Sequence, residues 1–188
     1  KKITGVHHKR DLPRVSKSLS SFIKIASKIE NRKVSVENPI KKVFLYIDEF
    51  TNYLDTEIGK DALILLESLN YEVFPVHHLE SGRTYISKGF LKDAVKITNQ
   101  NINFFKDLIT DKTPLIGIEP SAILTFRDEY IRLADDKISA EKIAKNTFTF
   151  EEFLAKELEN ENIDTSLFTS VPKTLKVHGH CHQKALSG

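Results

Sequence analysis

A short apolar run constrains the fold of this chain more than any other stretch. Residues 42–48 read Lys-Val-Phe-Leu-Tyr-Ile-Asp, which is typical of a strand buried on both faces. Three further strands are predicted at 71–76, 114–118 and 174–177. Helical patterns separate them without hairpin turns, so crossover connections are needed. We therefore predict an α/β fold with a mainly parallel sheet of about four strands and helices on both faces.

The helical patterns carry recognisable boundary signals. Pro120 suits the first position of a helix, and Thr149 followed by Glu152 forms a capping-box pattern. The segment 86–109 is predicted as helix, with a break around 98–101. The predicted helices are 16–29, 55–69, 86–109, 120–134, 139–145 and 149–159.

Composition bounds the class of protein. The chain has 188 residues, 40% of them apolar, a net charge of +2 and a single cysteine. That composition supports a real core, does not favour nucleic-acid binding and excludes an internal disulfide framework. Because there is neither a long apolar run nor a signal-peptide pattern, we expect a soluble, cytoplasmic protein. We predict an N-terminal helical segment and linker over 1–40 and an α/β domain over 41–188.

Polar residues follow the predicted strands at four places, and in a parallel sheet such residues gather at one edge, where ligands bind. Asp48 could bind a cation or act as acid or base, although a cap on the next helix explains it too. Gly82 and Arg83 could hold an anion, and Glu119 precedes a helix N-terminus, which favours a carboxylate. The binding candidates at this edge are Asp48, Glu80, Ser81, Gly82, Arg83, Glu119 and Ser121.

The fourth group contains the strongest metal-ligand pattern in the chain. His178, His180, Cys181 and His182 lie within five residues, and imidazole and thiolate are ligands for zinc, copper or iron. A polar loop without a ligand explains the spacing equally well. No residue is assigned a catalytic role, because histidines adjacent to a cysteine in sequence rarely give the geometry of a nucleophile pair.

Several stretches together resemble a known family. They are 48–53 (Asp-Glu-Phe-Thr-Asn-Tyr), 80–89, 117–129 and 178–186. From about residue 42 to 188 the chain resembles the cysteine-rich C-terminal region of FAD-linked oxidases with iron–sulfur domains, of the D-lactate and glycolate oxidase type. Related modules occur in heterodisulfide reductase and in the iron–sulfur subunit of anaerobic glycerol-3-phosphate dehydrogenase. Such modules come as two repeats, each named for a Cys-Cys-Gly signature.

The chain departs from this family at the cysteines. Glu80-Ser81-Gly82 stands where the family often has Cys-Cys-Gly, and Ala122 stands where it often has a cysteine. Iron–sulfur clusters are normally held by several thiolates. The chain therefore resembles a first repeat whose cysteines are replaced, and we expect no cofactor in it. Cys181 would be the first cysteine of a second repeat, with its partner cysteines beyond Gly188.

The resemblance implies that the parent protein is a flavin-dependent 2-hydroxy acid oxidoreductase carrying FAD and an iron–sulfur cluster. This chain would be the scaffold half of its electron-transfer module, inactive alone. Its implied partners are the second cysteine-rich repeat, the ferredoxin and flavin domains, and a peripheral electron acceptor at the inner face of the membrane. Two alternatives stay open. One is a zinc module built on the three histidines, with Cys181, Glu80 or His78 added, and the other is a purely structural interaction domain.

Overall fold

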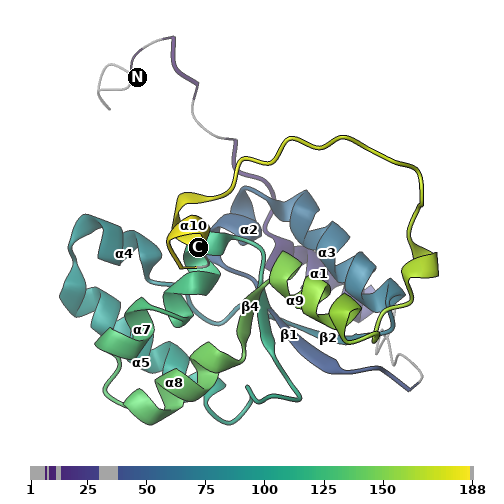
Figure 1. Ribbon diagram of the computed structural model, residues 1–188. Helices are drawn as coiled ribbons and strands as arrows, with labels where there is room; N and C mark the ends of the chain where they lie inside the picture. The colour runs from purple at the N-terminus through teal and green to yellow at the C-terminus, as the bar shows by residue number, and fades with distance from the viewer. Residues whose placement is uncertain (1–6, 8, 12–13, 30–37, 187–188) are drawn as a thin grey trace.

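The strands form one sheet in the part of the chain that the computed structural model describes, which is residues 7, 9–11, 14–29 and 38–186. Strand order is β2-β1-β3-β4, and every pairing is parallel (Figure 1). The predicted α/β class and parallel sheet are therefore confirmed. The strands are β1 (Lys42–Tyr46), β2 (Glu72–Val76), β3 (Leu115–Gly117) and β4 (Thr147–Thr149).

Helices cover both faces of this sheet, as predicted. One face packs against α1, α3 and α9, and the other against α5, α7 and α8 (Figure 1). The helices are α1 (Leu19–Ile29), α2 (Glu49–Tyr53), α3 (Thr56–Ser68), α4 (Arg83–Lys88), α5 (Leu91–Phe105), α6 (Pro120–Ile123), α7 (Glu129–Leu133), α8 (Lys137–Lys145), α9 (Phe150–Glu159) and α10 (Cys181–Leu186), with short 3₁₀ turns η1 (Leu124–Phe126) and η2 (Thr165–Leu167).

Strand β1 joins the two cores. Val43 and Leu45 belong to the core beneath α3 and α9, while Tyr46 belongs to the core beneath α5 and α7. Alternate strand residues point to opposite faces, so an apolar residue is required at nearly every position. This is the physical reason for the uninterrupted apolar run.

The prediction of a fourth strand over 174–177 is wrong. The fourth strand is β4, which pairs with β3, while 168–180 crosses the molecule as an extended segment outside the sheet (Figure 1). Leu175 and Val177 are 78% and 87% exposed, so this segment lacks the burial that would hold it against a sheet edge. Three residues of β4 between two helices give too short a pattern for sequence periodicity to detect.

The helix boundaries differ from prediction in three places. The break in 86–109 falls at Gly89, whose φ of 79° ends α4, and α5 runs without interruption through 98–101. The predicted helix 120–134 is divided into α6, η1 and α7. Helix α2 was not predicted. The capping box is confirmed, since Thr149 accepts a hydrogen bond from the Glu152 N–H and its own N–H donates to the Glu152 carboxylate.

The N-terminal segment is partly described. Leu19 of α1 is buried in the core beneath α3, so this helix packs on the domain, and the boundary at residue 40 stays a prediction. Most of the predicted linker lies outside the described residues. No helix among the described residues is long and apolar enough to cross a bilayer.

Candidate functional site at the carboxyl edge of the sheet

The carboxyl ends of β1 and β3 lie side by side at the centre of the sheet. The chain leaves β1 through α2 and α3 toward β2, whereas it leaves β3 through α6 and α7 toward β4. The connections thus depart toward opposite ends of the sheet, which is the arrangement that opens a ligand crevice in open α/β folds. The predicted polar groups lie on both sides of this point.

Asp48 follows β1 and caps α2. Its carboxylate accepts hydrogen bonds from the N–H groups of Phe50 and Thr51 at 2.8 and 3.0 Å and from the Thr51 hydroxyl at 2.6 Å. Burial raises the pKa of Asp48 to about 6, although these hydrogen bonds act to lower it. The capping role expected for Asp48 is confirmed. The three hydrogen-bond donors to its carboxylate all belong to α2, the helix that it caps.

Glu49 and Ser81 connect the loops after β1 and β2. The Ser81 N–H and hydroxyl donate to the two carboxylate oxygens of Glu49 at 2.9 and 2.8 Å. Ser81 is fully buried, and Gly82 has a φ of 74° at the start of α4, a backbone conformation that favours glycine. The turn at residues 80–82 is therefore hydrogen-bonded to Glu49, and this contact holds the loop after β2 against the loop after β1.

Tyr130 of α7 ties this turn to the helical layer. Its hydroxyl donates to the Ser81 carbonyl at 2.9 Å and accepts from the Asn101 amide at 2.7 Å. Burial raises the pKa of Tyr130 well above its usual value, so the hydroxyl stays protonated and serves as a donor. Next to it, Arg83 forms an ion pair with Glu129. These residues at the carboxyl edge of the sheet thus form a connected polar network with fixed geometry. We call this edge the rim.

Glu119 and Ser121 occupy the rim after β3. Glu119 caps α6, and its Oε1 accepts from the Ser121 hydroxyl at 2.6 Å and from the Ser121 N–H at 3.2 Å. The helix N-terminus favours a carboxylate here, as expected from the sequence. The carboxylate also faces the C-terminal segment.

The histidine and cysteine segment reaches the same rim, but through helix α10. His180 Nε2 lies 3.8 Å from Glu119 Oε1, and His182 Nε2 lies 3.9 Å from Glu129 Oε2. His180 Nδ1 accepts from the His182 N–H at 3.2 Å at the start of the helix. Cys181 is exposed. The predicted gathering of the four groups occurs, although the fourth arrives without a strand.

A cavity of about 710 Å³ lies where these elements meet. Its walls come from α2, α4, α6, the start of α7 and α10. Cationic and anionic side chains line it together, namely Arg83 and Lys88 with Asp128 and Glu129. The lining residues that bear on its chemistry are Arg83, Ser121, Asp128, Glu129, Cys181 and the two histidines His180 and His182. We call this space the rim cavity.

Some predicted site residues lie away from the rim cavity. His178 is exposed and is not among its lining residues. The hydroxyl of Tyr85 donates to the Glu80 carboxylate at 3.2 Å, and His78 stacks on Phe104 with ring centroids 4.1 Å apart. The structure therefore does not bring Glu80, His78 and His178 together with the other histidines.

The sequence interpretation missed the two carboxylates that line the rim cavity. Asp128 and Glu129 stand at the start of α7, and their carboxylates approach His182. They lie in a stretch that contributed to the family resemblance, yet no spacing rule connects them to the C-terminal histidines. Only the packing of α10 on the rim brings them together.

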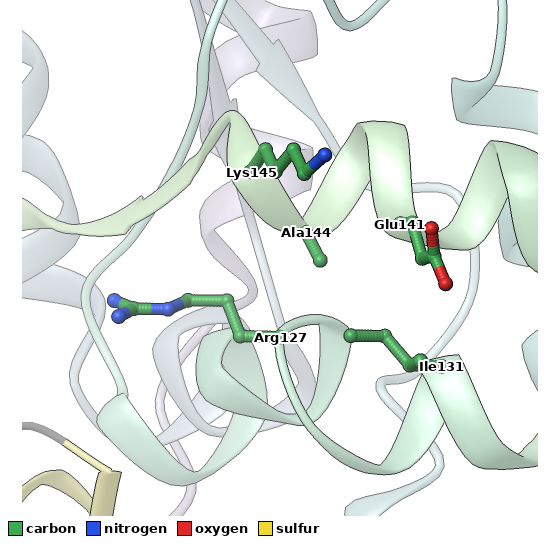
Figure 2. A pocket seen from close by; sticks show the side chains of 5 residues that line it. All are labelled: Arg127, Ile131, Glu141, Ala144 and Lys145. Atoms are coloured by element: carbon green, nitrogen blue, oxygen red, sulfur yellow. The ribbon is translucent and has the colours of Figure 1, made fainter.

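A second hollow of about 380 Å³ lies between α7 and α8 and is shown in Figure 2. Ile131 on one side faces Ala144 on the other, and Glu141 and Lys145 stand on α8 (Figure 2). Arg127, at its border, forms an ion pair with Glu152 at 2.6 Å. It is a shallow groove between packed helices, and none of its lining residues lines the rim cavity.

The rim does not fit an iron–sulfur cluster held by this chain. Ser81 is committed to Glu49, Ala122 is buried and has no ligand atom, and Cys181 is the single thiol of the sequence. Clusters need several thiolates. The fold and the site together define a parallel α/β domain with a polar cavity at its central strand ends.

The chain is related to 2-hydroxy acid dehydrogenases and to lactate utilization protein A. It is 27% identical over 132 residues to D-2-hydroxyglutarate dehydrogenase of Escherichia coli (strain K12), covering 70% of this chain and 13% of that protein. It is 28% identical over 152 residues to lactate utilization protein A of Bacillus subtilis (strain 168), covering 78% of this chain and 60% of that protein. The chain thus spans only part of these relatives. No model of a known family matches it, and no solved structure does.

Proposed function

We propose that this chain is the scaffold half of an electron-transfer module in a flavin-dependent, iron–sulfur-containing 2-hydroxy acid oxidoreductase. The parent protein would oxidise a D-lactate-like or glycolate-like substrate on FAD and pass electrons through iron–sulfur clusters. The chain would not be catalytic by itself. Distant relatives named D-2-hydroxyglutarate dehydrogenase and lactate utilization protein A support this direction.

The observation that carries the proposal is the position of Cys181. It stands exposed at the first residue of α10, on the rim cavity and beside the central strand ends. A thiol presented in this way can ligate a cluster whose other thiolates come from a neighbouring cysteine-rich repeat. The hydrogen-bonded network of Glu49, Ser81 and Tyr130 would supply a rigid platform for that repeat.

In this proposal the rim residues hold the platform and its charges, and no reaction step is assigned to them. Arg83 and Glu129 form an ion pair beside the cavity. The surface on which the second cysteine-rich repeat would dock therefore carries paired charges. Docking of the ferredoxin and flavin domains, and of a peripheral electron acceptor at the membrane, belongs to the same proposal.

Iron and acid-labile sulfide analysis tests this function. It compares this chain with the longest natural form of the protein, both purified without oxygen, together with the Cys181→Ser variant of the long form. We expect iron and sulfide in the long form. In the variant we expect the iron and sulfide content to fall by the amount that one cluster contains. A long form without iron, or one whose content the variant leaves unchanged, contradicts the role of Cys181.

A further inference from the structure

Three metal-ligating side chains from two separate segments meet at the wall of the rim cavity. Asp128 and Glu129 come from the start of α7, and His182 comes from α10. One ligand atom of each lies within 4.8 Å of the other two. Within the described part of the chain, this is the one group of three such residues with that geometry. All three line the rim cavity.

Glu129 supplies an independent sign that a cation belongs here. Its Oε2 is buried and has no hydrogen-bond partner, while its Oε1 is held by Arg83. The His182 Nε2 atom lies 3.9 Å from Oε2, which is too far for a hydrogen bond. A buried carboxylate oxygen without a partner is costly and calls for an explanation.

The donor set indicates the class of ion. Two carboxylates and one imidazole suit a borderline divalent ion such as Zn²⁺, whereas Mg²⁺ and Ca²⁺ prefer oxygen ligands alone. We propose that Asp128, Glu129 and His182 bind one zinc-type divalent ion, with a remaining coordination position open to the rim cavity. The buried Oε2 of Glu129, which has no hydrogen-bond partner, becomes a ligand of the ion.

Two arginines orient the proposed ligands. Arg83 holds Glu129, and Arg132 holds Asp128, so each carboxylate keeps one oxygen for the ion while the other is fixed. Such outer partners orient ligands in metal sites. Their positive charges also lower the affinity, so the site binds more weakly than one made of free carboxylates.

The proposal differs from a site built on the C-terminal histidines and the cysteine. His178 has no part in it, and His180 faces Glu119 instead. The ion would cross-link α10 and the start of α7, two segments that are far apart in sequence. This zinc site is independent of the proposed electron-transfer function, because it can form whether or not the parent protein carries an iron–sulfur cluster.

Equilibrium dialysis against zinc tests the site. The whole chain is first stripped with a chelator and then dialysed against ZnCl₂, as wild type and as His182→Ala, Glu129→Gln and His178→Ala. We expect about one bound zinc per wild-type chain and at least tenfold weaker binding in the first two variants. The His178→Ala control removes a histidine of the same segment and should bind as wild type does.

Circular dichroism and thermal unfolding show whether each variant folds, since Glu129→Gln also alters the pair with Arg83. If that variant unfolds, His182→Ala and Asp128→Asn decide the outcome. Cobalt substitution reads the donor set, and we expect d–d absorption without a thiolate charge-transfer band.

Three results overturn the proposal. They are substoichiometric zinc in the wild type, unchanged affinity in the folded His182→Ala and Glu129→Gln variants, and equal loss in His178→Ala. A fourth result would also overturn it, since a thiolate band that Cys181→Ser removes would assign the ion to the cysteine.

Discussion

The rim of the sheet and the C-terminal segment 168–186 meet at one cavity but are held by different forces. At the rim, Asp48 and Ser81 are almost completely buried. Asp48 is hydrogen-bonded to Thr51 of the helix that it caps, and Ser81 is hydrogen-bonded to Glu49 in the loop after β1. In the C-terminal segment, Leu175 and Val177 are largely exposed. Its histidines approach the rim carboxylates only at 3.8 and 3.9 Å. Rim geometry is therefore set by the fold, whereas the segment is attached by weak contacts.

This difference teaches where change can occur without loss of the fold. Ser81 and Ala122 lie in the fixed region and are buried. Cys181 lies in the weakly attached region and is exposed. A ligand or a partner can reposition that segment at little cost, while the rim stays in place.

The largest expected effect comes from the core beneath the rim. Phe126 is fully buried and packs against the rings of Tyr46, Phe105 and Tyr130. Phe126→Ala should lower the free energy of unfolding by about 3–5 kcal/mol. The control Leu175→Ala, in the exposed segment, should change it by less than about 0.5 kcal/mol. Urea unfolding of the two variants measures these changes in the free energy of unfolding. Equal changes would contradict the distinction between the core beneath the rim and the C-terminal segment.

The next effect is a pH dependence carried by Asp48. Its pKa is about 6 in the folded chain because of burial, against about 3.9 in an unfolded one. The folded state therefore binds more protons between these values, and stability falls as pH rises through this window, by up to about 3 kcal/mol. Asp48→Asn keeps an N-cap residue and removes this component.

Urea unfolding of wild type and Asp48→Asn from pH 4 to pH 7 measures the difference. We expect the variant to gain stability relative to wild type as pH rises. Parallel profiles of the two proteins would mean that the carboxyl of Asp48 ionises normally and that burial does not perturb it.

A smaller effect is expected from the hydroxyl that joins α7 to the rim. Tyr130→Phe leaves the Ser81 carbonyl and the Asn101 amide without this partner, at a cost of about 1–3 kcal/mol. Tyr85→Phe is the matched control, because that hydroxyl makes a longer, only partly buried bond to Glu80 at 3.2 Å and should matter less. Thermal unfolding compares the two, and a cost shared equally by both would argue against a rigid network.

The smallest effect on global stability should come from cutting the C-terminal segment. Trypsin should cleave first after Lys173 or Lys176, both exposed in an extended stretch. Lysines within the helices, such as Lys142, should be protected. Mass spectrometry of the products identifies the sites, and thermal unfolding of the cut chain should change little. Early cleavage within α8 would show that the helical layer opens as readily as the segment.

The elements with strong local signals were predictable. The apolar run of β1 and the capping box at Thr149 each depend on neighbouring residues, and both were found. Strand β4 and helix α2 are three and five residues long, and such short elements form because the surrounding core holds them. Sequence periodicity cannot detect them, and an exposed run at 174–177 took the place of the fourth strand in the prediction.

The sequence by itself determined the alternation of strands and helices and the parallel sheet. Burial on both faces and crossover connections require these features, and both are written in the order of residue types. Only the tertiary structure decided which polar residues meet. Asp128 and Glu129 face His182 because α10 packs on the rim, and that contact joins segments far apart in the chain, where no sequence period records it.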